Sequence, residues 1–106
     1  MDIIENIDRI EKYSAEMSER DFSRDILVMD AVERCLQRIT EASIHVQPFG
    51  RKNFPTQDWV EIRKLGDLLR HGYEVVRPAI IWRIMQIELP ALRTDCLRAI
   101  EMLKRD

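Results

Sequence analysis

Apolar residues recur at helical spacing from the start of the chain. Ile3, Ile7, Ile10 and Met17 follow one another at steps of four, three and seven, and polar residues fill most of the positions between them. Residues separated by such steps lie on one face of an α-helix. The pattern therefore predicts an amphipathic helix over residues 2–17.

Two more helices are predicted in the first half. Ser18 is followed three residues later by Asp21, a variant capping box that could open a short second helix or lead directly into a longer one. From Ser23 to about Val46 the apolar positions again step by three and four, which predicts the longest amphipathic helix of the chain. Its apolar stripe consists of Met29, Val32, Leu36 and Ile39.

Residues 45–58 interrupt the periodicity. They contain two prolines and one glycine among polar residues, so they are predicted to form a loop. Asp58 and Glu61 then mark a new helix start, because carboxylates favour the first turn of a helix. A fourth helix is predicted from Trp59 to about Tyr73.

The last helical pattern begins at Pro78, a residue suited to the first turn of a helix. Apolar residues continue through Ile87 and Leu103, and Pro90 is predicted to kink this helix or to divide it in two. No strand-like alternation of any length occurs. We expect an all-α fold, a bundle of four or five helices in one domain covering residues 1–106.

Composition and charge narrow the function classes. The chain has 106 residues, 45% hydrophobic content and a net charge of −2. Residues 51–83 are the basic part, with 7 Lys/Arg against 4 Asp/Glu. An excess of this size could help to place a phosphate, but it disfavours a protein that coats nucleic acid generically.

The two cysteines, Cys35 and Cys96, stand far apart and form no metal-binding motif. This spacing indicates neither a zinc site nor a disulfide framework, and we expect no cofactor. The acidic N-terminus is unlike a signal peptide, and no apolar run is long enough for a membrane span. We expect a cytoplasmic protein that does not bind a membrane.

The fourth predicted helix carries the candidate chemistry. At about 100 degrees per residue, its apolar face excludes His71, and Asp67 lies one turn before that histidine. A carboxylate there could hold the imidazole and favour its charged form. Arg63 and Arg70 share the same polar surface, and an arginine binds a phosphate with two parallel hydrogen bonds. These four residues could form a metal-free site for phosphodiester cleavage.

The alternative is an ordinary exposed helix face with charge pairs one turn apart. Gly66 lies at the edge of the apolar face, where we expect another helix to come close. Trp59 and Trp82 are expected to anchor the core or an interface. His45, beside the predicted loop, is expected to lie at a helix end and to act there as a cap.

The order "DAVERCLQRITEAS", a loop, "DWVEIRKLGDLLRHGYEVV" and "IIWRIMQIELPAL" resembles the HepT-like branch of the HEPN superfamily, the toxin half of HepT/MntA toxin–antitoxin pairs. The resemblance runs from about Ile3 to Leu103. The family pattern has an arginine, a polar residue, a histidine separated from the arginine by four to six residues, and a tyrosine two residues further. His71 and Tyr73 match its last two positions and Asp67 its polar residue. With four intervening residues, the arginine would fall at Gly66.

The resemblance implies a homodimer in which two motif helices face each other across a cleft and cleave RNA without a metal. It also implies a nucleotidyltransferase antitoxin that modifies Tyr73 with AMP. In this reading His71 is the general acid or base, Arg70 or Arg63 stabilises the phosphate charge and Asp67 orients the histidine. A non-catalytic subunit that docks on a small nucleotidyltransferase and a plain helical dimerisation module are the alternatives.

Overall fold

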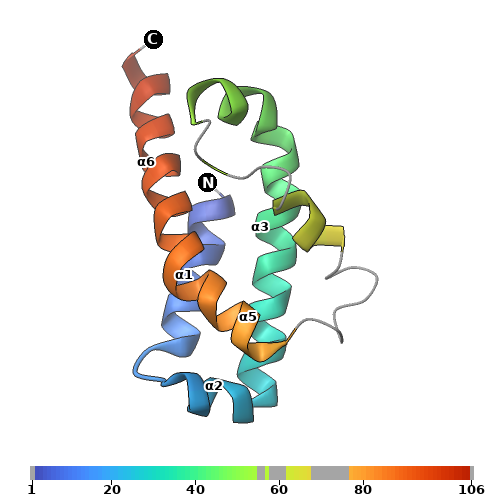
Figure 1. Cartoon of the computed structure of the whole chain (residues 1–106). Helices are drawn as coiled ribbons and strands as arrows, with labels where there is room; N and C mark the ends of the chain where they lie inside the picture. The colour runs from blue at the N-terminus through green and yellow to red at the C-terminus, as the bar shows by residue number, and fades with distance from the viewer. Residues whose placement is uncertain (1, 55–56, 58–61, 68–76, 106) are drawn as a thin grey trace.

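A computed structural model describes residues 2–54, 57, 62–67 and 77–105, and all its regular elements are helices (Figure 1). This confirms the predicted all-α class. The elements are α1 (Asp2–Ser14), α2 (Glu19–Arg24), α3 (Ile26–Asn53), a helix of residues 62–67, α5 (Pro78–Arg83), the π-helical turn η2 (Ile84–Glu88) and α6 (Leu89–Arg105).

Three long elements build the bundle. α1 packs against α3 and against α6, while α2 lies across one end, where it contacts α3 and α5 (Figure 1). Arg93 of α6 donates a hydrogen bond of 2.8 Å from Nε to Asp8 of α1, which joins the first and last helices. None of the described helices is both long and apolar enough to cross a membrane.

The core follows the predicted apolar stripes. Ile3, Ile7 and Ile10 of α1 are buried, and so are Val32, Leu36 and Ile39 of α3. Phe22 of α2 is completely buried, and its ring lies 5.6 Å from that of Trp82 in α5. Trp82 is therefore a half-buried packing residue, as predicted for a core anchor.

α1 is shorter than predicted. It ends at Ser14, and Glu16 adopts a left-handed backbone conformation with φ of 66°. The backbone N–H of Met17 then donates to Ser14 at 3.0 Å and closes a turn. The helix was expected to reach residue 17 and ends three residues earlier, at Ser14. The prediction was wrong because Met17 has the spacing of a helix position although it follows this turn.

The start of α2 confirms the capping box. The backbone N–H of Asp21 donates to Ser18 Oγ at 3.1 Å, and the N–H of Ser18 donates to Asp21 Oδ2 at 3.2 Å. α3 begins later than the predicted Ser23, because Asp25 caps it and accepts a hydrogen bond from the N–H of Val28 at 3.0 Å.

The prediction of a loop over residues 45–58 is wrong for residues 45–53. α3 continues through Pro48 to Asn53, and its end bends in Figure 1, as expected where a proline removes a backbone donor. Phe49 and Phe54 stabilise this extension, with ring centroids 6.2 Å apart, and Arg98 of α6 lies over the ring of Phe54. His45 is consequently an exposed residue inside α3, and its predicted role at a helix end is wrong.

Pro90 changes the helix without dividing it. The backbone N–H of Leu89 donates to the carbonyl of Ile84, five residues back, so one π-helical turn precedes the proline and α6 follows directly. Such a turn is one of the ways in which a helix accommodates an irregular hydrogen-bond ladder. Pro78 opens α5, as predicted.

Candidate functional site

The helix of residues 62–67 has two distinct sides. Ile62 and Leu65 are half-buried and pack against the core, whereas Arg63, Lys64 and Asp67 are exposed. This sidedness confirms, for the described part of the fourth predicted helix, that the apolar positions face the bundle.

Gly66 marks the closest approach of this helix to α3. It is buried, and a Cβ atom built on it would lie 2.8 Å from Oγ1 and 2.9 Å from Cβ of Thr40. Real Cβ atoms essentially never approach other heavy atoms this closely. The expectation that another helix comes close to Gly66 is confirmed, and the contact residue is Thr40.

The predicted site residues divide into two groups. Arg63 and Asp67 are both exposed, and their separation of four residues places them one helical turn apart. Arg70, His71 and Tyr73 lie outside the described residues, as does Trp59. The approach of Asp67 to His71 therefore stays a prediction.

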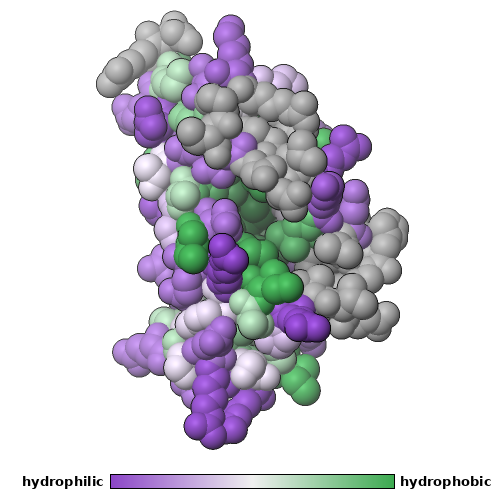
Figure 2. Space-filling model, in the orientation of Figure 1, coloured by the Kyte–Doolittle hydropathy of each residue, from purple (hydrophilic) through white to green (hydrophobic). Residues whose placement is uncertain are grey.

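A groove that the sequence did not predict runs beside this helix. It has a volume of about 460 Å³, with a floor that includes Leu36, Ile39 and Leu92. Ile62 and Leu65 line one wall, and α5 and η2 form the other. Figure 2 shows apolar side chains gathered on this face of the molecule.

The rim of the groove is mixed in charge. Lys64 and Arg83 lie on opposite walls, and Glu88 also lines the groove. Ile80 of α5 also lines the groove, and its side chain is 50% exposed. A groove lined mainly by apolar side chains is typical of a surface that binds another molecule.

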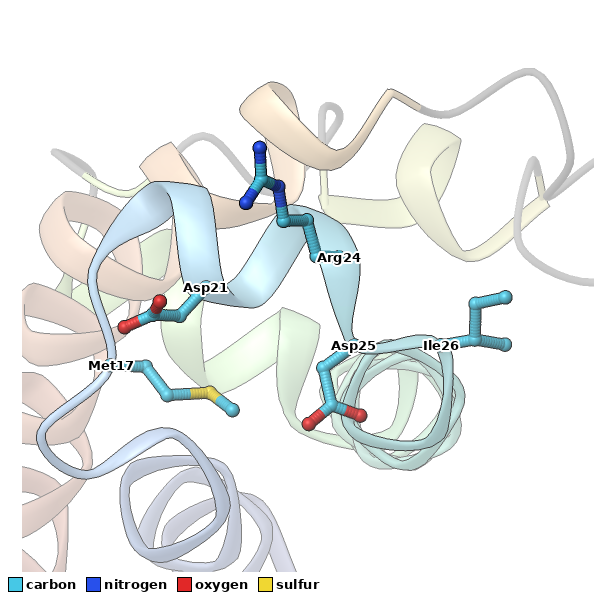
Figure 3. Close-up of a pocket in the computed structure, with 5 residues that line it drawn as sticks. All are labelled: Met17, Asp21, Arg24, Asp25 and Ile26. Carbon is cyan, nitrogen blue, oxygen red and sulfur yellow. The ribbon is translucent and has the colours of Figure 1, made fainter.

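A second hollow lies at the corner between α1, α2 and α3 (Figure 3). Its two carboxylates, Asp21 and Asp25, already accept hydrogen bonds as helix caps. Figure 3 shows the side chain of Arg24 pointing away from both. This hollow therefore lacks a convergent set of polar groups.

The buried thiols carry no site chemistry. Burial raises the pKa of Cys35, and burial together with the neighbouring carboxylate of Asp95 raises the pKa of Cys96 to about 11. Such thiols stay protonated and unreactive near neutral pH. Among the described residues no group of three or more His, Cys, Asp or Glu side chains is arranged to hold a metal ion.

Comparison with known proteins places the chain in context. The family model described as Ribonuclease HepT-like matches residues 3–99. "Probable ribonuclease HepT" of Thermococcus cleftensis is 32% identical over 87% of the chain and 84% of its own length. "Gamma-glutamylcyclotransferase and putative RNase" of Methanocaldococcus jannaschii is 28% identical over 98% of the chain, which spans only 47% of that protein. No solved structure matches the chain.

Proposed function

Because the chain belongs to the HepT-like ribonuclease family of HEPN proteins, we propose that it is an endoribonuclease that cleaves RNA without a metal ion. The observation that carries the proposal is the family match over residues 3–99, a range that includes Asp67 and His71. The exposure of Arg63 and Asp67 on that helix supports it, because a polynucleotide substrate needs an open site.

The reaction that suits these residues is a transfer within the RNA. The 2′-hydroxyl oxygen attacks the adjacent phosphorus, and the bond from phosphorus to the 5′ oxygen of the next nucleotide breaks. His71 takes the proton of the attacking hydroxyl or donates one to the leaving oxygen. Arg63 or Arg70 stabilises the charge that develops on the phosphate, and Asp67 holds the imidazole in position.

A single chain supplies one histidine to this step, and a second copy supplies the other acid–base group. The proposal therefore includes a homodimer. The groove and the exposed Ile80 that lines it support a homodimer, since they leave an apolar surface beside the helix of residues 62–67 that association would cover.

The first experiment measures cleavage of a mixed RNA substrate by the purified protein in EDTA. We expect the wild type to cleave and His71→Ala to abolish cleavage, because His71 is the single histidine of residues 59–73 and histidine is the side chain suited to exchange a proton near neutral pH. His45→Ala is the matched control, since His45 is an exposed histidine on α3 and should be dispensable. A wild type without activity in EDTA would refute the proposal.

The partner is the second part of the proposal. We propose that a nucleotidyltransferase antitoxin neutralises the protein by attaching AMP to Tyr73. On co-expression with such an enzyme we expect a mass increase of one AMP unit that Tyr73→Phe removes. Tyr13→Phe is the control, because Tyr13 is 41% exposed but lies on α1. Modification that persists in Tyr73→Phe would contradict the assignment.

A non-catalytic role is the second candidate, and Gly66 is the observation that favours it. The family arginine is absent at this position, so the protein could act as a binding subunit of a nucleotidyltransferase. In that case the complex would form with wild type and with His71→Ala alike, and neither would cleave RNA.

A further inference from the structure

We propose that the contact between Gly66 and Thr40 closes position 66 to every side chain, and that Arg63 supplies the phosphate-binding cation instead. The second half rests on the proposed endoribonuclease function. The first half is a statement about packing and can be tested without any activity.

The packing argument starts from Thr40. This residue is only 3% exposed, and its hydroxyl donates to the carbonyl of Gln37 at 2.9 Å, which fixes its rotamer. Rotation could carry Oγ1 away from an added side chain, but Cβ is bonded directly to the backbone of α3. The distance of 2.9 Å from that Cβ would therefore persist in any rotamer.

The helix of residues 62–67 cannot easily retreat from Thr40. Ile62 and Leu65 precede Gly66 on the same helix and pack against the core, so moving the helix outward would expose both. Overpacking at such a contact is destabilising in well-packed interiors. An arginine at position 66 would thus break the crossing between this helix and α3.

Of the described cations of this helix, Arg63 and Lys64, Arg63 lies closer to Gly66 around the helix axis. At about 100 degrees per residue, Arg63 lies about 60 degrees around the helix from Gly66, whereas Lys64 lies about 160 degrees away. Lys64 lines the groove on the other side of the helix. Arg63 is exposed and precedes Asp67 by one turn, so a phosphate held by its guanidinium would lie beside the same carboxylate.

The activity test replaces the arginine. We expect Arg63→Gln to lower kcat/KM for RNA cleavage by about 100-fold, the size found when one charge-stabilising donor is lost. Arg63→Lys should retain part of the activity, because the charge remains but the two-pronged contact does not. Arg20→Gln, which removes an exposed arginine from α2, should leave the rate unchanged. A rate for Arg63→Gln equal to that of Arg20→Gln would overturn the role of Arg63.

The packing test restores the family residue. We expect Gly66→Arg to give no gain in cleavage and to lower Tm by at least about 5 °C. Gly66→Ala should also lower Tm. Adding Thr40→Gly to the Gly66→Ala variant should recover part of that loss, because it removes both Oγ1 and Cβ of Thr40. Thr40→Ala should recover less, since it leaves the Cβ.

These measurements separate the two proposals. If Gly66→Arg kept the wild-type Tm, or rescued cleavage in Arg63→Gln, position 66 would be open and the inference would be wrong. A wild type that cleaves no RNA would overturn the endoribonuclease function and with it the role of Arg63. The Tm values of the Gly66 and Thr40 variants would decide the packing in either case.

Discussion

Burial sets the protonation of the two cysteine side chains. The sequence predicted two isolated thiols, and both are buried and free. Cys35 has a raised pKa even though Arg38, Arg9 and Arg34 act in the opposite direction. For Cys96 burial acts together with Asp95, so the shift is larger.

The raised pKa of Cys96 predicts a loss of stability in alkali. Its folded-state value of about 11 exceeds the ordinary value of 9.0, so the stability is complete below pH 9 and falls as the pH rises towards 11. A shift of this size contributes on the order of 2 kcal/mol to the free energy of unfolding. We expect Cys96→Ala to lose less stability than wild type between pH 8 and pH 10.5, measured by urea unfolding under reducing conditions.

For each protein, the free energy of unfolding at pH 10.5 is subtracted from the value at pH 8, and the two differences are compared. This removes the effect of other groups that titrate in alkali in both proteins. Equal losses in wild type and in Cys96→Ala would show that the thiol does not ionise preferentially in the unfolded chain.

At the candidate site, the sequence predicted the side of the helix on which each residue lies. The exposure of Arg63 and Asp67 and the close approach at Gly66 all followed from a rotation of about 100 degrees per residue. The identity of Thr40 as the contacting residue could not be predicted. Periodicity orients a residue within its own helix but contains no information on the register between two helices.

Elements were predicted well where local chemistry fixes their ends. The capping box of Ser18 and Asp21 and the first-turn position of Pro78 depend on neighbours within a few residues. The length of α3 was mispredicted because Pro48 and Gly50 are local signals for a loop. The contacts of Phe54 with Phe49 and Arg98 outweigh them, and the contact with Arg98 joins positions far apart in the sequence.

The cap of α2 provides a test at this scale. We expect Ser18→Ala to lower the free energy of unfolding by about 1 kcal/mol, because the N–H of Asp21 loses its acceptor. In a protein of this size the change lowers Tm by about 5 °C, which circular dichroism can measure.

Ser23→Ala is the control for the cap. Ser23 is an exposed serine of the same helix, but its hydroxyl donates to the carbonyl of Arg20 and caps no helix start. A Tm for Ser18→Ala no lower than that for Ser23→Ala would show that the cap contributes nothing.

For the whole molecule, the sequence predicted a helical bundle but not the groove on its surface. The groove arises where α3, the helix of residues 62–67, α5 and η2 meet. Each contributes residues that looked like ordinary core positions, among them Leu36, Ile39 and Ile84. Whether such a position faces the interior or lines an open groove depends on how far apart its neighbouring elements lie.

The homodimer can be tested on this surface. We expect Ile80→Glu to weaken dimerisation by at least about 100-fold, because a symmetric interface loses the buried side chain and gains a charge in both copies. Light scattering coupled to size exclusion, over a series of protein concentrations, measures the change.

Leu103→Glu is the matched control, since Leu103 is 59% exposed and Ile80 50%, but Leu103 lies near the C-terminal end of α6. If both variants keep the mass of wild type at every concentration, Ile80 and the groove beside it do not hold a dimer together.

The contact between Gly66 and Thr40 also limits how this sequence can change over generations. A larger side chain at either position would clash with the residue at the other, so we expect the two positions to vary together among relatives. Where a relative has an arginine at the position of Gly66, we expect a glycine at the position of Thr40 or a wider helix crossing. A lineage that has lost the arginine and gained the threonine would then regain the arginine only through two coordinated replacements.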